Sequence, residues 1–189
     1  SLDHSQDLSP SFMVGYEPRN DLLYVAVEVR DDVLHNPPGG SATRTDACEI
    51  YVSGLRGDAP GNGPTQYVMV PGRHNYAGFT GNPGVKGGRI GNTETRGAWR
   101  RRGDVTTYEW QVQVFDRPRQ RTRFEDGMVI GFDVVVADGD GHDDTGRDTA
   151  AWVPWGPAVS AKRIGNERIG RLVIAPEAWS AGFEDGPVH

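Results

Sequence analysis

The segment GFDVVVADGDGHDD, residues 131–144, decides the fold and raises the main question about the site. Its first half is apolar at almost every position, so both faces of an extended chain would be apolar. This pattern predicts a central strand of a sheet that is covered on both sides. Asp133 interrupts the run, and a carboxylate buried there needs a charged or hydrogen-bonding partner. The second half, from Asp138, is acidic and rich in glycine, which predicts a loop.

Alternation of apolar and polar residues marks further strands around this segment. In LLYVAVEVRDD, residues 22–32, the valines fall on one face and the charged residues on the other. TYEWQVQVF, residues 107–115, repeats the pattern and places Trp110 inward. Together with shorter segments, the predicted strands cover residues 11–17, 22–32, 46–52, 66–70, 107–115, 128–138 and 170–176.

Loops rich in glycine and proline separate these strands, and helical patterns are few. The 26 glycines and 13 prolines make up about a fifth of the 189 residues, which favours many turns. Long loops are expected at 35–45, 56–64 and 72–98, and single helical turns after Pro118 and at 176–180. We therefore predict one all-β domain over residues 1–189, an antiparallel sandwich of two sheets with jelly-roll or immunoglobulin-like connections.

The bulk composition limits the partners and the chemistry. The formal net charge of −6 argues against nucleic acid or an anionic membrane as a partner held by charge alone. No apolar run has the length of a membrane span, so we expect no membrane insertion. The single cysteine, Cys48, excludes an internal disulfide. It alternates with Ile50 and Val52, which predicts a buried structural thiol rather than a nucleophile.

The order of these elements resembles that of a known family. DLLYVAVEVRDD is followed by TDACEIYVSG, TTYEWQVQVF and FEDGMVIGFDVVVADGDG, and then by a tryptophan segment and IGRLVIAP. This order is similar to that of the family-nine carbohydrate-binding modules and their DOMON-like relatives, over roughly residues 10–176. The element GFDVVVADGDG is the most specific part of the resemblance.

The resemblance implies a two-sheet sandwich and a non-catalytic domain, often appended to secreted glycoside hydrolases. It implies sugar binding by a pair of aromatic side chains that hold the sugar ring, aided by polar groups, and it implies structural calcium ions. This sequence departs from the family at one place. Sugar-binding members carry a tryptophan ahead of the strand that corresponds to residues 46–52, and GGSATRTDACEIYV, residues 39–52, contains none.

The acidic segment has two interpretations. Calcium takes six to eight oxygen ligands, and closely spaced carboxylates repel one another unless a cation lies between them. The glycines would let the backbone fold around an ion, although the spacing is not that of an EF-hand. Alternatively, aspartate and glycine serve only the geometry of a turn. The candidate calcium ligands are Asp138, Asp140, Asp143 and Asp144.

Aromatic side chains outside the core are the candidates for sugar contact, because sugar rings present flat faces of C–H groups. Trp152 and Trp155 are three residues apart in an extended segment, so they face opposite ways and at most one is expected in the core. Trp99 and Tyr76 lie in or beside the long loop. We predict a ligand site built from Trp152 or Trp155 together with Trp99 or Tyr76.

We therefore expect a non-catalytic module that binds a glycan or polysaccharide, in an extracellular or periplasmic protein and compatible with attachment to a larger multidomain chain. No nucleophile elbow, zinc-type histidine cluster or phosphate loop indicates an enzyme. Two alternatives remain. One is a structural or protein-interaction sandwich without sugar binding. The other is a DOMON-like redox domain that binds haem b through a methionine and a histidine or lysine.

Overall fold

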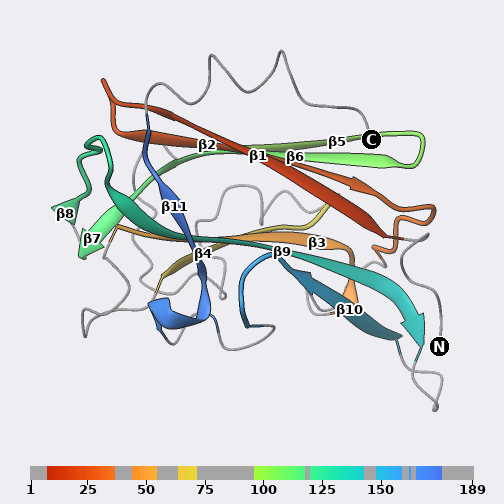
Figure 1. Cartoon of the computed structure of the whole chain (residues 1–189). Helices are drawn as coiled ribbons and strands as arrows, with labels where there is room; N and C mark the ends of the chain where they lie inside the picture. Colours follow the sequence, from red (N-terminus) through yellow and green to blue (C-terminus); the bar gives the residue numbers. More distant parts are fainter. Residues whose placement is uncertain are drawn as a thin grey trace, which may run out of the picture.

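The computed structural model describes residues 8–36, 44–54, 64–71, 96–117, 120–142, 148–158, 162 and 165–175. These residues form two larger antiparallel sheets stacked face to face, drawn as the upper and lower layers of Figure 1. Helical structure in these ranges is limited to short 3-10 turns such as η2 (Asn166–Arg168). The predicted all-β sandwich is confirmed.

The upper layer of Figure 1, which we call the first sheet, is built from two hairpins. Along β2 the alternation seen in the sequence places Leu23, Val25 and Val27 toward the other sheet. Gly103 has a φ of 61° in the two-residue turn between β5 and β6, a conformation that favours glycine. The strand order is β1 (Ser9–Glu17), β2 (Leu22–Arg30), β6 (Val105–Gln113) and β5 (Arg96–Arg102).

The second sheet is organised around β9, which spans Val129–His142. One edge of β9 pairs with β3, and the other edge is shared by two strands. Along that shared edge, β11 pairs with residues 129–132 and β10 pairs with residues 135–142. The neighbours of β9 are β3 (Ala47–Ser53), β4 (Thr65–Met69), β10 (Asp148–Pro154) and β11 (Gly170–Val173). A small pair, β7 (Phe115–Arg117) with β8 (Gln120–Arg121), lies apart from both sheets.

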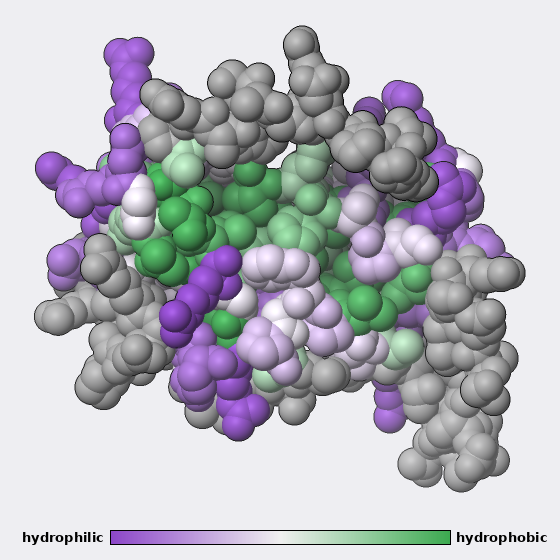
Figure 2. All heavy atoms as spheres, viewed as in Figure 1, coloured by the Kyte–Doolittle hydropathy of each residue, from purple (hydrophilic) through white to green (hydrophobic). Residues whose placement is uncertain are grey.

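The main hydrophobic core fills the space between the two sheets. Hydrophobic side chains form a band between the layers in Figure 2, which is viewed from the same side as Figure 1. Trp110 and Phe132 belong to this core, as expected from their strand positions. Cys48 is also fully buried there, and burial raises its thiol pKa well above the usual value. The predicted structural thiol is confirmed.

The outer face of the second sheet is covered as well. Every residue of β3 is buried, and β9 is buried from Ile130 to Gly139. Two small hydrophobic clusters lie on this outer face, one around Ala47 and Ala137 and the other around Tyr51 and Val135. The prediction of a central strand that is covered on both sides is therefore confirmed for β9.

The structure differs from the sequence prediction in several segments. Residues 96–102 form β5, whereas residues 96–98 were expected at the end of the long loop at 72–98 and no strand was predicted for residues 99–102. Residues 148–154 form β10, and β9 continues through Gly141 into the acidic segment. Residues 120–121 form β8, where a helical turn was expected. In β5 the arginines leave few apolar residues to alternate, and in β10 residues 150–153 are all apolar, so neither strand shows a period of two. No helix within the described ranges has the length and apolar character of a membrane span.

A buried ion pair lies at the point on β9 where β10 ends and β11 begins. Asp133 and Lys162 form this pair, and their side chains are 0% and 1% exposed. The other carboxylate oxygen of Asp133 accepts a hydrogen bond of 2.8 Å from the backbone N–H of Gly156. The partner that the sequence required for Asp133 is therefore present. Through its hydrogen bond with Gly156, Asp133 also connects the chain beyond β10 to the middle of β9.

Two glycines allow the chain to pack closely at this point. A Cβ atom on Gly156 would lie 2.3 Å from a carboxylate oxygen of Asp133. A Cβ atom on Gly170 would lie 2.3 Å from the ring of Trp155. Real Cβ atoms do not approach neighbours this closely, so both positions require glycine for space.

Replacing Lys162 tests the weight of the ion pair. Lys162→Met leaves the Asp133 carboxylate buried without its cation, and we expect a loss of about 3–5 kcal/mol in the free energy of unfolding. Adding Asp133→Asn removes the stranded charge and should recover part of that loss. Urea denaturation followed by tryptophan fluorescence measures both changes.

The control is Arg30→Met, which breaks the exposed ion pair with Asp104. Exposed pairs contribute about 0–1 kcal/mol, so this variant should stay close to the parent protein. A Lys162→Met variant as stable as the control would contradict the role assigned to the pair.

Candidate functional site

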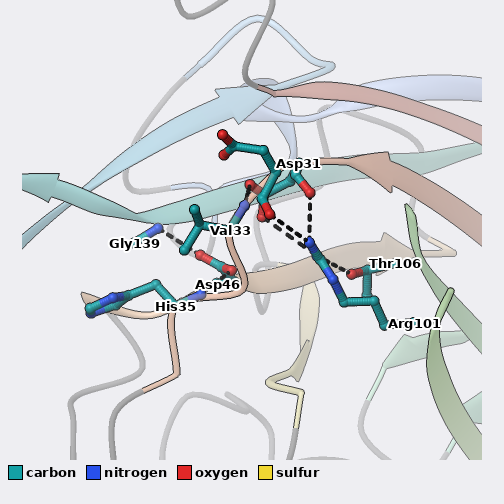
Figure 3. Close-up of polar contacts among 8 residues, drawn as sticks. Asp31, Val33, His35, Asp46, Arg101, Thr106 and Gly139 are labelled. Atoms are coloured by element: carbon teal, nitrogen blue, oxygen red, sulfur yellow. Dashed lines mark hydrogen bonds and ion pairs between the residues drawn. The ribbon is translucent and has the colours of Figure 1, made fainter. Parts of the chain in front are cut away.

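The acidic segment is tied to the rest of the sandwich by the carboxylate of Asp46, the residue before β3. Asp46 accepts a hydrogen bond of 2.8 Å from the N–H of Gly139 and one of 2.7 Å from the N–H of His35. Figure 3 shows this carboxylate between the two segments. Asp46 thus joins the start of β3 to β9 and to the chain that follows β2.

Gly139, the first glycine of the DGDG sequence, is required for packing. A Cβ atom there would lie 2.7 Å from the Cα of Thr45 and 3.0 Å from the carbonyl oxygen of Arg44. These are backbone atoms that cannot rotate away, so a larger residue would push the two segments apart. This glycine is therefore explained without a bound ion.

A second buried aspartate, Asp31, is held at the same end of the sandwich. Its carboxylate accepts a hydrogen bond of 3.1 Å from the N–H of Val33 and lies 3.9 Å from the Arg101 guanidinium. Arg101 also donates to the carbonyl oxygen of Asp31 at 2.6 Å and to the hydroxyl of Thr106 at 3.0 Å (Figure 3). Asp31 and Asp46 thus already accept protein donors, and neither fits the role of a free metal ligand.

The calcium site stays a prediction. Asp138 is buried in β9, and the backbone of Asp140 lies in the same strand. Asp143 and Asp144 lie outside the described residues. Where the structure is described, no group of three or more acidic, histidine or cysteine side chains is arranged to hold a metal ion.

Four polar side chains cross the outer face of the second sheet in one row, and a fifth lies beside that row. Tyr51 on β3 is in register with Gln66 on β4 and with Asp133 on β9, beyond which Lys162 lies. Glu49, two residues before Tyr51, accepts a hydrogen bond of 2.5 Å from the Tyr51 hydroxyl. We call these five side chains the polar row. All five are buried.

The polar row contains an acceptor that has no hydrogen-bond partner among the described residues. The amide oxygen Oε1 of Gln66 is buried and has no hydrogen-bond partner within the described part of the chain. Buried polar atoms usually have partners, so this acceptor is open to a hydroxyl donor from a water molecule or from a ligand. Trp152 is half-buried and packs against both clusters on this face. An aromatic ring, a carboxylate, a phenol and an amide therefore share one face of the sheet.

The predicted aromatic residues are not all brought together. Trp152 packs on the outer face of the second sheet, whereas Trp155 packs edge-on against Phe12 with ring centroids 5.3 Å apart and also contacts Phe132. The two tryptophans thus face opposite ways, as their spacing predicts. Trp155 remains 47% exposed.

Trp99 does not join either of these tryptophans. Its ring lies on the inner face of β5 and packs against the main core. The first sheet has β1 at one edge, beside Trp155, and β5 at the other, so the pairing of Trp99 with Trp155 is not formed. The physical reason is that residues 96–102 form a strand. The odd-numbered side chains of this strand, Trp99 among them, point toward the core. Tyr76 lies outside the described residues.

Sequence reasoning missed Glu49, Tyr51 and Gln66. The alternation in TDACEIYV places Glu49 and Tyr51 on the face opposite Cys48 and Ile50, and no role was predicted for that face. The signal was the second apolar face of β9, which implies that the outer face of this sheet is covered. Polar residues on a covered face need a purpose or a partner.

The haem alternative gains no support from the methionines. Met69 is fully buried in the main core, and Met128 packs against it. Met13 lies on the outer face of the first sheet, and His74 lies outside the described residues.

The fold and the site define a class of protein: an antiparallel β-sandwich with a polar row and a tryptophan on one covered sheet face. A family model described as the carbohydrate family 9 binding domain-like family matches residues 2–166. The chain belongs to this family. No curated protein sequence matches the chain.

Two similar solved structures are carbohydrate-binding modules of family 9 from Caldicellulosiruptor kristjanssonii. The complex with cellotriose has a TM-score of 0.62 at 16% identity and covers 95% of this chain and 82% of that one. The complex with glucose has a TM-score of 0.59 at 16% identity and covers 88% and 76%. At this identity the similarity supports the fold alone.

Gly139→Ala tests the packing explanation for the acidic segment. The added methyl group clashes with the backbone at Thr45, and we expect a loss of about 1–3 kcal/mol in the free energy of unfolding. Ser11→Ala on exposed β1 is the control and should change stability little. An unchanged stability of Gly139→Ala would show that the close contact is not required.

Thermal unfolding with calcium and with chelator tests the predicted metal site. A ligand at about a hundred times its Kd stabilises the folded protein by about 2.7 kcal/mol, so calcium should raise Tm if it binds in residues 138–144. The double variant Asp143→Asn, Asp144→Asn should remove that increase. Identical melting curves in calcium and in chelator would contradict the site.

Proposed function

We propose that this domain binds a glycan without catalysis, and that the sugar lies against the polar row and Trp152 on the outer face of the second sheet. Membership of the carbohydrate family 9 binding domain-like family is the observation that carries this proposal. The names of the two similar structures support it, because those modules are complexes with cellotriose and with glucose.

The chemistry of this face suits a sugar. A sugar ring presents apolar C–H groups that pack on an aromatic ring, and hydroxyl groups that both donate and accept hydrogen bonds. Trp152 supplies the aromatic surface. The Glu49 carboxylate accepts from hydroxyls, and the unpaired Oε1 of Gln66 accepts as well.

Two members of the polar row, Asp133 and Lys162, have a structural role. Asp133 and Lys162 neutralise each other, so they contribute little net charge to the site. The ligand contacts are therefore assigned to Glu49, Tyr51 and Gln66. A neutral sugar suits this division, because Lys162, the cation of the polar row, is paired with Asp133.

We extend the proposal to an extracellular or periplasmic protein in which this domain serves as a binding module, because structural polysaccharides lie outside the cytoplasm. The missing tryptophan ahead of β3 is compatible with this assignment if Trp152 supplies the aromatic contact from β10.

Two substitutions in the polar row test the proposal. Glu49→Gln removes a charged acceptor, worth about 1.5–3 kcal/mol, and should weaken sugar binding roughly 10-fold to 100-fold. Gln66→Leu removes an unpaired acceptor, so it should weaken binding while leaving the Tm unchanged or higher. Binding is measured on an array of neutral cello-, xylo-, malto- and laminari-oligosaccharides, and affinity by isothermal titration calorimetry.

The matched control is Glu28→Gln, an exposed glutamate on the first sheet. It should bind as the parent protein does. Absence of binding to the whole array by the folded parent protein would overturn the proposed function. Binding that survives both Glu49→Gln and Gln66→Leu would keep the function and reject the polar row as the site.

A further inference from the structure

The outer face of the first sheet carries a hollow that the proposed function does not use. The hollow has a volume of about 620 Å³ and lies across all four strands of that sheet. Sites for small molecules and oligosaccharides typically measure about 300–1,000 Å³. It lies on the opposite outer face of the sandwich from the polar row. The outward side chains that line it are Met13, Tyr24, Ala26, Arg96, Ala98, Glu109 and Gln111.

The strand register explains why this face is hollow. Two rows of side chains cross the sheet next to each other, and each mixes small with large residues. Small residues form the floor, and longer side chains stand around it as a rim. The first row is Gly15, Tyr24, Gln111 and Arg96, and the second is Met13, Ala26, Glu109 and Ala98.

The apolar part of the rim is exposed. Tyr24 is 40% exposed and Met13 is 49% exposed, although large apolar side chains on strands usually face a core. The Tyr24 hydroxyl donates a long hydrogen bond of 3.5 Å to a carboxylate oxygen of Glu17. An aromatic ring held on a sheet surface is a platform for the C–H face of a sugar.

The polar part of the rim carries both donors and acceptors. Arg96 donates, Glu109 accepts and Gln111 does both, and all three lie in two adjacent rows. The charges of Arg96 and Glu109 balance, so the hollow does not favour a phosphate or another anion. Neighbouring hydroxyls of a neutral sugar fit such alternating donors and acceptors.

The length of the hollow favours a chain over a single sugar. Four strands give three spacings of about 4.8 Å each, so the face is about 14 Å across. We propose that this hollow is a second glycan-binding surface, which takes a neutral oligosaccharide chain and makes the domain bivalent. The inference rests on the proposed function, because it assigns the same class of ligand to the opposite face.

Two binding surfaces on opposite faces cannot be filled by one short chain. The domain would therefore hold two separate glycan chains at once. A bivalent module joins neighbouring chains and gains affinity for a polysaccharide surface through a high effective concentration.

Isothermal titration calorimetry with cellohexaose tests the second surface. The parent protein should bind two molecules of cellohexaose, and Tyr24→Ala and Arg96→Ala should each weaken one of the two binding events about ten-fold or more. Arg100→Ala is the matched control, since Arg100 lies exposed on the same strand but does not line the hollow. It should leave both events unchanged.

The outcomes separate this inference from the proposed function. A single binding event that Glu49→Gln removes and Tyr24→Ala leaves intact would overturn the second surface and keep the first. A single event that Tyr24→Ala removes and Glu49→Gln leaves intact would support the hollow as a glycan site and overturn the polar row and bivalency. No binding of cellohexaose by the folded parent protein, or self-association that Tyr24→Ala abolishes, would overturn the inference.

Discussion

The buried ion pair of Asp133 and Lys162 is the interaction on which the second sheet depends. It occupies the gap on the edge of β9 between the end of β10 and the start of β11. The same carboxylate holds the N–H of Gly156, so the chain is fixed where it leaves β10. Without that anchor, the ring of Trp155 would have no fixed place over Gly170. A buried charge is costly alone, which makes the pair an all-or-none constraint on this part of the fold.

The ion pair also affects the outer face of the second sheet. Asp133 and Lys162 lie at the β9 side of the polar row, and their charges cancel within the protein. The proposed ligand contacts are therefore assigned to Glu49, Tyr51 and Gln66. The two outer faces of the sandwich differ from each other. The face of the second sheet is covered and polar at its centre, and the face of the first sheet carries a hollow with an exposed tyrosine.

Much of the fold follows from the sequence, because the period of two is strong where valines alternate with charged residues. This holds for β2 and β6. β9 was predicted instead from its nearly continuous apolar run, and the buried Asp133 correctly implied a partner. The arginine-rich β5 and the return strand β10 could not be found in this way. Their residues have little apolar contrast, and their strand structure depends on pairing with β6 and β9.

The candidate site was harder to predict than the fold. Lys162 comes from a segment without a repeating pattern, and nothing local shows that it reaches Asp133. Trp152 was expected as a ligand contact, but its polar neighbours come from β3 and β4, far away in the sequence. Trp99 was expected beside Trp152 or Trp155, and its side chain instead faces the core. Sequence spacing gives the face of a side chain within a strand, but it does not tell which strands meet.

The most direct test of the central claim is a nuclear magnetic resonance titration of the ¹⁵N-labelled protein with cellohexaose. If a sugar binds at the polar row, the amide signals of Glu49, Tyr51 and Gln66 should shift in a saturable way. A second, separate set of shifts around Tyr24 is expected from the opposite face. Shifts confined to other parts of the molecule, or no shifts at all, would contradict the account.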